Sequence, residues 1–324
     1  MRESSAEQRV LVRAAVLYYR EGATQAEVAH QLGVSRATAG RMLVRARETG
    51  LVRIEIASPL TRQIEVEIAL EKRFGLVEAV VVEPVVPGDH PGVELGLACA
   101  DLLMRRLRSG MVLGLGWQSD PRDPIAHTGE ALRPMVSAGT RPANVTVAQL
   151  AGSLPDGAAR RNPGRSIADV AGALGAQERL IPAPLFVDDP VTVTTLMSDS
   201  TVREALAAAG KSDVCLFGVG DVTETTPLFV NGYLDSGALT DLRTLGAVGD
   251  IAGRFFDADG RPVDGALARR TVGVTLDTIA NSPLRIATAA GPARVAALRA
   301  AFTGDLANIL VTDVATATGL LETD

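Results

Sequence analysis

The sequence contains few of the residues from which disulfide frameworks and metal sites are made. Its two cysteines, Cys99 and Cys215, both lie in apolar surroundings, which predicts buried thiols and a reducing compartment. The three histidines, His30, His90 and His127, stand apart without the spacing of a ligand set. The sequence therefore predicts neither a disulfide nor a metal site.

Several longer patterns are also missing. No apolar run approaches the roughly 20 residues of a membrane-spanning helix, and the first residues lack the apolar core of a signal peptide, so we expect a cytoplasmic protein. There is no Walker A loop and no GxGxxG fingerprint, and no cofactor is predicted. Because no Ser–His–Asp or Cys–His set is evident, we predict no catalytic residues and no enzyme.

Charge is unevenly distributed along the 324 residues, whose formal net charge is −6. Residues 1–57 contain nine arginines and six acidic residues, whereas the remainder contains 23 basic and 32 acidic residues. The first segment is therefore positive and the second is negative. A small basic end on an acidic body is typical of one module that binds polyanions and a second that does not.

The stretch from residue 24 to residue 43 has the pattern of a helix-turn-helix. Val28, Ala29 and Leu32 fall on one face of a first helix. Gly33 can then provide the turn, and Ser35 can cap a second helix that lies in the major groove of DNA. The alternative is an ordinary pair of helices with solvated arginines. The residues that we expect to contact operator DNA are Gln25, Ser35, Arg36, Thr38, Arg41 and Arg45.

Segments on either side extend this head and connect it to the rest of the chain. A helix is predicted over residues 8–21, and the alternation of apolar and charged residues over 52–56 predicts a strand that would form a short wing. A linker begins at Ser58. The helix predicted over residues 61–74 carries Ile64 and Ile68 one turn apart. This helix either couples the head to the second domain and contacts a second copy, or it packs on its own domain.

From residue 80 onward, apolar runs alternate with helical segments. Runs without polar alternation, separated by helices, predict a parallel sheet covered on both faces, with ligands at the carboxyl ends of its strands. Residues 120–142 contain four prolines and are predicted to form a loop over that edge. Helices are expected over residues 96–107, 166–174, 201–209, 293–302 and 314–321. Strands are expected over residues 80–82, 111–114, 145–150, 180–187, 214–217, 271–276, 284–287 and 309–312.

Glycines and polar residues follow several of these predicted strands. Glycines at residues 114–116 and 218–220 would let backbone amides approach a ligand, although such a pattern is more often a simple turn. Asp250 follows another glycine turn and can either accept hydrogen bonds from sugar hydroxyls or cap the turn. Arg294 opens a helix, where a cation needs an anionic or polar partner. Asp313 is expected to cap the final helix.

Six short motifs stand out along the chain: Arg13-Ala-Ala-Val-Leu-Tyr-Tyr19, Thr24-Gln-Ala-Glu-Val-Ala29, Ser35-Arg-Ala-Thr38, Gly246-Ala-Val-Gly-Asp-Ile251, Phe255-Phe-Asp257 and Leu310-Val-Thr-Asp313. These motifs resemble those of the SorC family of bacterial sugar-sensing transcription regulators, also grouped with DeoR-type repressors. The resemblance covers nearly the whole chain. It implies an α/β protein with an N-terminal winged helix-turn-helix and a Rossmann-like parallel-sheet sensor domain similar to sugar-phosphate isomerases and deaminases. Members are usually tetramers that release DNA when a sugar, sugar phosphate or polyol binds.

The sequence departs from the family pattern at the predicted effector site. The family tends to have Trp-Gly-x-Thr after the glycine loop, where this chain has Trp117-Gln-Ser-Asp120. The family lysine after the later Gly-Gly turn is replaced by Arg294, and that turn reads Ala290-Gly291. Because Asp120 adds a negative charge that would repel an anion, we predict an unphosphorylated sugar or polyol. The alternative is a sugar phosphate, which Arg294 could hold.

Together these patterns predict a DNA-binding repressor of carbohydrate or polyol genes that assembles as a dimer or tetramer. Residues 1–57 would bind DNA, and residues 58–78 would form a linker and a helix that couples the two domains. Residues 79–324 would bind the effector and form the oligomer. The alternatives are a sugar-phosphate isomerase or deaminase with a DNA-binding head, and an architectural DNA-binding protein without a ligand. The expected effector contacts are Gly116, Trp117, Gln118, Ser119, Gly218, Gly220, Asp250 and Arg294.

Overall fold

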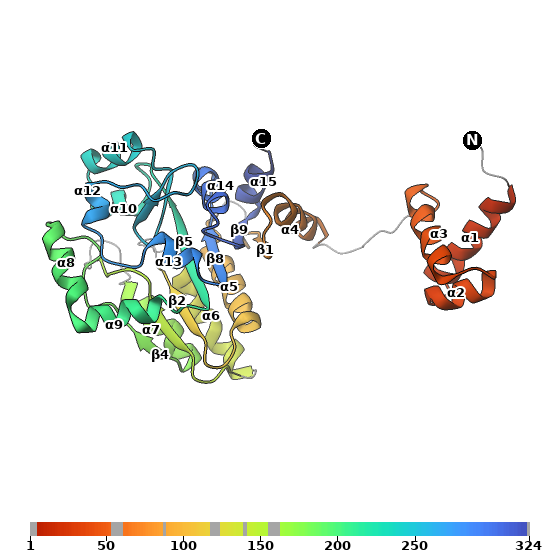
Figure 1. Ribbon diagram of the computed structural model, residues 1–324, viewed down its shortest axis with the longest axis horizontal. Coiled ribbons are helices and arrows are strands. Elements are labelled where there is room, and N and C mark those ends of the chain that lie inside the picture. Colours follow the sequence, from red (N-terminus) through yellow and green to blue (C-terminus); the bar gives the residue numbers. More distant parts are fainter. Residues whose placement is uncertain are drawn as a thin grey trace. The chain divides into compact units, whose positions relative to one another are not determined.

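The computed structural model describes residues 5–52, 61–86, 89–116, 124–138, 141–154 and 163–322. The chain separates into two compact units, Met1–Thr61 and Arg62–Asp324 (Figure 1). We refer to the first unit as the head and to the second as the large domain, and we describe each by itself.

The described residues of the head form three helices, α1 (Ser5–Tyr19), α2 (Gln25–Leu32) and α3 (Arg36–Glu48). Thr24 caps α2 in a capping box with Glu27, and Gly33 ends α2 in the left-handed conformation at φ 67°. Ser35 accepts a hydrogen bond from the amide of Thr38 and caps α3. The predicted helix-turn-helix is therefore formed. Its small core consists of Ala14, Leu17, Val28, Ala29, Ala39 and Leu43.

The predicted wing lies almost entirely outside the described residues, because residues 53–60 are not described. At its near edge, the amide of Val52 donates a hydrogen bond to the carbonyl of Ala46. The first helix of the head begins three residues earlier than predicted and ends two residues earlier. The wing itself stays a prediction.

The large domain is built on one mixed sheet whose parallel part has the order β1-β9-β8-β5-β2-β3-β4. β6 (Gly249–Ile251) and β7 (Arg254–Phe256) form a hairpin, and β6 pairs antiparallel with the end of β5. The chain reverses its direction of travel across the sheet between β2 and β5, and ligands of such sheets bind at this kind of switch point. The parallel strands are β1 (Glu78–Val82), β2 (Val112–Leu115), β3 (Thr146–Gln149), β4 (Gln177–Arg179), β5 (Val214–Asp221), β8 (Leu284–Ala289) and β9 (Ile309–Asp313).

Helices cover both faces of the sheet (Figure 1). In β5, Val214 and Leu216 belong to one hydrophobic cluster, whereas Cys215 and Phe217 belong to the other. The first cluster includes residues of α5 (Gly92–Arg106), α6 (Pro124–Ala138) and α7 (Pro163–Leu174). The second includes residues of α4 (Thr61–Phe74), α9 (Ser200–Ala209), α13 (Leu276–Ala280), α14 (Val295–Thr303) and α15 (Val314–Glu322).

The remaining helices are short and lie in the connections. They are α8 (Pro190–Ser198), α10 (Pro227–Val230), α11 (Ser236–Thr244), α12 (Ala266–Arg269) and the 3₁₀ helix η1 (Pro292–Arg294). Both cysteines are buried as free thiols. None of the described helices combines the length and the apolarity needed to cross a bilayer.

Three predicted elements are wrong. Residues 180–187 and 271–276 are not strands of the sheet; they meet through isolated bridges such as Phe186 with Thr271, and β4 lies earlier in the chain. In the first segment, Ile181, Ala183 and Val187 alternate with more exposed residues and pack in one cluster with Val272 of the second segment and with residues of α9. The predicted loop over residues 120–142 contains helix α6, which begins at Pro124 and includes Pro134. A proline at the first helical position costs nothing because its missing amide has no intrahelical partner.

Helix α4 has the predicted bounds and uses one face to pack on its own domain. Leu70 is fully buried. The carboxylates of Glu67 and Glu71 accept hydrogen bonds from the amides of Val81, at 2.8 Å, and Ala79, at 3.1 Å, on the outer edge of β1. These bonds satisfy an edge strand that would otherwise expose its amides. The opposite face leaves Ile64 and Ile68 exposed by 47% and 42%.

Candidate functional site

The outward face of α3 borders a wide hollow on the head. Arg36, Arg41 and Arg45 line it, and Gln25 of α2 joins them beside Gly40. Ser35 and Thr38 have capping roles: their hydroxyls lie 2.8 Å apart, and the Thr38 hydroxyl also accepts a hydrogen bond from Arg41. The other lining residues are Ala37, Val44, Glu48 and Thr49.

A second candidate site is a pocket at the carboxyl edge of the large domain's sheet. Gly218 and Gly220 of β5, Asp250 of β6 and Arg294 of η1 meet there, although they are far apart in the sequence. The antiparallel pairing of β6 with β5 sets Asp250 opposite Gly220. The pocket contains about 390 Å³ of empty space, part of it open to solvent. Its other lining residues are Leu185, Thr226, Pro227, Leu228, Ala252 and Gly253.

Asp250 is held in a constrained and largely buried position. Its Oδ2 accepts a hydrogen bond from the amide of Gly253 at 3.1 Å, and only 8% of the residue is exposed. A Cβ added to Gly220 would lie 1.9 Å from the Oδ1 of Asp250, so only glycine fits there. Ala252 and Gly253 both have positive φ values, 52° and 77°, as a tight two-residue hairpin turn requires.

The pKa of Asp250 is raised to about 6, chiefly because burial deprives the charged carboxylate of water and to a smaller extent because Asp221 is nearby. The amide of Gly253 and the charge of Arg294 act in the opposite direction. The pocket therefore presents a carboxyl group that is more easily protonated than an exposed one.

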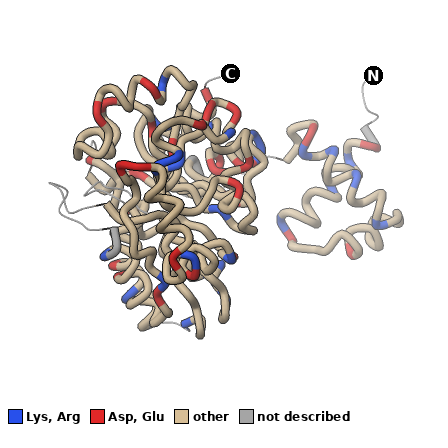
Figure 2. Tube along the Cα trace, turned by 60° about the vertical axis from the view of Figure 1, so that its left-hand side comes forward, with Lys and Arg blue, Asp and Glu red and all other residues tan. Residues whose placement is uncertain are grey.

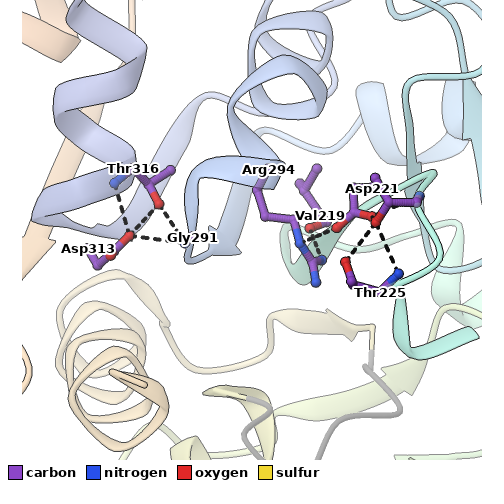
Figure 3. A network of polar contacts seen from close by, with 8 residues as sticks. Val219, Asp221, Thr225, Gly291, Arg294, Asp313 and Thr316 are labelled. Atoms are coloured by element: carbon purple, nitrogen blue, oxygen red, sulfur yellow. Dashed lines mark hydrogen bonds and ion pairs between the residues drawn. The ribbon is translucent and has the colours of Figure 1, made fainter. Parts of the chain in front are cut away.

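Arg294 already has an anionic partner within the protein. Its Nε lies 2.7 Å from the Oδ2 of Asp221, and its Nη1 donates a hydrogen bond to the carbonyl of Val219 at 3.1 Å. Figure 3 shows Arg294 directed toward Val219 and Asp221. Asp221, which is 3% exposed, is anchored on its other oxygen by the amide and hydroxyl of Thr223.

Asp221 is a residue that sequence reasoning missed. The requirement for an anionic partner of Arg294 was recognised, but the sequence did not show which carboxylate fulfils it. One signal was available, since Asp221 ends β5, a run of eight residues that are all buried. A charged group at the end of such a run needs a partner.

The neighbouring network in Figure 3 has a structural role. Asp313 accepts a hydrogen bond from the amide of Thr316 at 3.2 Å and so caps α15, as predicted. The amide of Gly291, just before η1, donates to the hydroxyl of Thr316 at 2.7 Å. This contact fixes the start of the segment that carries Arg294.

Arg254 holds the hairpin of the pocket against the segment that follows it. Its guanidinium donates hydrogen bonds to the carbonyls of Ala268, Thr271, Gly273 and Val274, at 3.0 to 3.2 Å. Burial lowers the pKa of Arg254. The turn that carries Ala252 and Gly253 is thereby tied to residues 268–274.

The other predicted effector residues are placed differently. Gly116 follows the last residue of β2 and lies against β5, where an added Cβ would come within 2.9 Å of Phe217, and it does not line the pocket. Trp117, Gln118 and Ser119 lie outside the described residues, as does Asp120, so their contribution stays a prediction. Within the described part of the chain, no group of three or more His, Cys, Asp or Glu residues could hold a metal ion.

Comparison with known proteins identifies the family. The family described as "Putative sugar-binding domain" matches residues 58–322. Transcriptional regulator LsrR of Klebsiella pneumoniae is 32% identical over 98% of this chain and 94% of its own. The full-length sorbitol operon regulator SorC from Klebsiella pneumoniae superposes with a TM-score of 0.69 and 27% identity, over 98% of this chain and all of that one. The chain belongs to the SorC family of transcription regulators.

A further relative is the deoxyribonucleoside regulator of Bacillus subtilis, 29% identical over 97% of both chains. Membership in the SorC family confirms the predicted α/β fold and favours a transcription regulator over the enzyme alternative.

The raised pKa of Asp250 makes a pH-dependent contribution to stability. A carboxyl whose pKa rises on folding, here from 3.8 to about 6, binds its proton more tightly in the folded than in the unfolded state. Its contribution is therefore fully present below about pH 4 and is lost as the pH rises through about 6. Over the whole titration, this contribution to the free energy of unfolding changes by about 3 kcal/mol.

We predict that Asp250→Asn, which cannot ionise, gains stability relative to the wild type as the pH is raised from about 4 to about 7. The gain in the free energy of unfolding should approach about 3 kcal/mol. Urea unfolding of both proteins across this range measures it, since other carboxyl groups cancel in the difference. Parallel stability curves for the two proteins would contradict the prediction.

Proposed function

We propose that this SorC-family regulator is a cytoplasmic repressor of carbohydrate or polyol genes and that its effector binds in the pocket beside Asp250. The observation that carries the proposal is the convergence of Gly218, Gly220, Asp250 and Arg294 on one pocket at the sheet's carboxyl edge. That edge is where ligands of open α/β sheets bind. The family description as a sugar-binding domain supports the same assignment.

The pocket chemistry suits a compound with several hydroxyl groups. Asp250 offers a carboxylate oxygen that can accept hydrogen bonds from neighbouring hydroxyls, and it is held rigidly by Gly253. Leu185 and Leu228 supply apolar surface for the carbon skeleton. A few fixed polar groups in a mostly apolar pocket are typical of a small-molecule site.

Binding controls the head only if the effector has different affinities for two arrangements of the protein. We propose that α3 contacts operator DNA in one of them, with Arg36, Arg41 and Arg45 reaching bases or phosphates and Gln25, Ser35 and Thr38 supporting them. Effector binding then favours the other arrangement and releases the DNA.

For the head, we predict that Arg36→Ala weakens operator binding by about 1–3 kcal/mol, the usual contribution of an arginine that reads a base. The matched control is Arg47→Ala, because Arg47 lies on the same helix but does not line the hollow. Both variants lose one positive charge. Fluorescence anisotropy at fixed salt, with an operator fragment selected using the wild-type protein, compares them. If the two variants bound the operator with equal affinity, Arg36 would be excluded as a residue that contacts a DNA base.

We propose that Ile64 and Ile68 of α4 contact a second copy of the chain in a dimer or tetramer. These side chains are exposed on a helix whose other face is already packed, and a head of this type binds paired half-sites. We therefore expect the double variant Ile64→Glu, Ile68→Glu to sediment with a lower mass than the wild type. A wild-type monomer that binds operator with full affinity would contradict this proposal.

For the effector, we predict that Asp250→Ala abolishes both the thermal shift caused by the ligand and the release of DNA, with operator affinity unchanged. Stability should not suffer, because the buried carboxylate is unfavourable at neutral pH. A melting-temperature screen of sugars, polyols and their phosphates identifies the ligand. The control is Asp259→Ala, which removes an exposed carboxylate outside the pocket. An unaltered ligand response in Asp250→Ala would exclude this pocket.

A further inference from the structure

We propose that Asp221 determines the charge class of the effector: by neutralising Arg294, it makes the pocket select an uncharged polyhydroxyl compound over the corresponding phosphate ester. This inference rests on the proposed function of the pocket as the effector site. It assigns a specificity role to a residue that lies behind the pocket and is not one of its lining residues.

The first step is that Arg294 is already engaged within the protein at two of its three nitrogens. Nε pairs with Asp221 at 2.7 Å and Nη1 donates to the carbonyl of Val219 at 3.1 Å, so two of its three nitrogens are directed into the protein. Among the described residues, Nη2 has no hydrogen-bond partner. A phosphate needs several donors from a cation, and a bidentate arginine is the usual arrangement. While Asp221 holds Nε, Arg294 cannot offer the bidentate arrangement that uses Nε together with one of its Nη nitrogens.

The second step is that Asp221 cannot easily leave. Its Oδ1 is held by the amide of Thr223 at 3.0 Å and by the hydroxyl of the same residue, which in turn lies 2.8 Å from the hydroxyl of Thr225. Moving the carboxylate away from Arg294 would break these bonds in a buried environment, where unsatisfied charges are costly. An incoming anion must therefore compete with a fixed carboxylate.

The third step is the charge balance around the pocket. Within the described chain, the charged lining residues are Asp250 and Arg294, and Asp221 lies directly behind Arg294. Two carboxylates against one guanidinium leave the site negative when Asp250 is ionised and neutral when it is protonated. A phosphate dianion is repelled in the first state and gains little in the second, because opposite charges attract strongly only where they are uncompensated. Hydroxyl groups, in contrast, can donate to Asp250 in its ionised state.

The test compares matched neutral and phosphorylated ligands on the full-length chain. The pairs are sorbitol with sorbitol 6-phosphate, ribose with ribose 5-phosphate, and fructose with fructose 6-phosphate, together with inorganic phosphate alone. Thermal shift and calorimetric titration give the affinities. For the pair that binds, we expect the wild type to prefer the neutral member by about tenfold or more and to be unaffected by inorganic phosphate.

Asp221→Asn keeps the shape of the side chain and frees the charge of Arg294. In this variant, we expect the ratio of affinities for the neutral and the phosphorylated ligand to fall by about tenfold or more. We also expect inorganic phosphate to raise its melting temperature. The double variant Asp221→Asn, Arg294→Gln should lose the response to phosphate again. The matched control is Asp305→Asn. Asp305 forms an ion pair with Arg285, another buried arginine, and Arg285 does not line the pocket. This control should leave the ligand preference unchanged.

Two results would overturn the inference: a wild-type protein that binds the phosphorylated member more tightly, or an Asp221→Asn variant that neither changes the preference nor responds to inorganic phosphate. Near-UV circular dichroism shows whether each variant is folded. Failure of the proposed function gives a different pattern, since no carbohydrate would then shift the wild-type melting temperature. The inorganic phosphate comparison between wild type and Asp221→Asn still tests the inference in that case.

Discussion

A buried ion pair between Arg294 and Asp221 joins two segments at the carboxyl edge of the sheet, the end of β5 and the turn after β8. Removing one partner of such a pair typically costs about 3–5 kcal/mol, because the other charge is left uncompensated. The pair also fixes the position of the pocket wall, since Arg294 reaches the carbonyl of Val219 at the same time. The shape and the charge of the pocket therefore depend on one interaction.

The hairpin β6–β7 completes the pocket with groups that reduce stability when considered alone. Asp250 is buried with a raised pKa, and Ala252 has an unusual positive φ. Arg254 compensates by donating hydrogen bonds to four backbone carbonyls. A carboxyl group that is unfavourable for folding but open to a ligand is expected at a binding site and unexpected in a purely structural core.

Much of the fold could be predicted from sequence, because uninterrupted apolar runs between helices identify a parallel sheet. The short hairpin was missed, since three-residue strands such as β6 have no measurable periodicity. Asp250 and Arg294 were selected from glycine turns, from a helix start and from the family resemblance. Asp221 was not, because a sequence does not show which carboxylate will meet a given arginine. The pairing of β5 with β6 and the position of η1 decide that in three dimensions.

The distribution of arginine partners explains how a chain with a net charge of −6 can have one surface suited to a polyanion. Basic and acidic residues are interspersed along the large domain (Figure 2). Several of its arginines are paired with carboxylates, as Arg105 and Arg106 are with Glu78. In the described head, no ion pair engages Arg36 or Arg41 on the hollow face of α3. A phosphate in contact with such a side chain lies well within the Debye length of about 8 Å. The local charge of α3 therefore governs that contact, and the net charge of the chain does not.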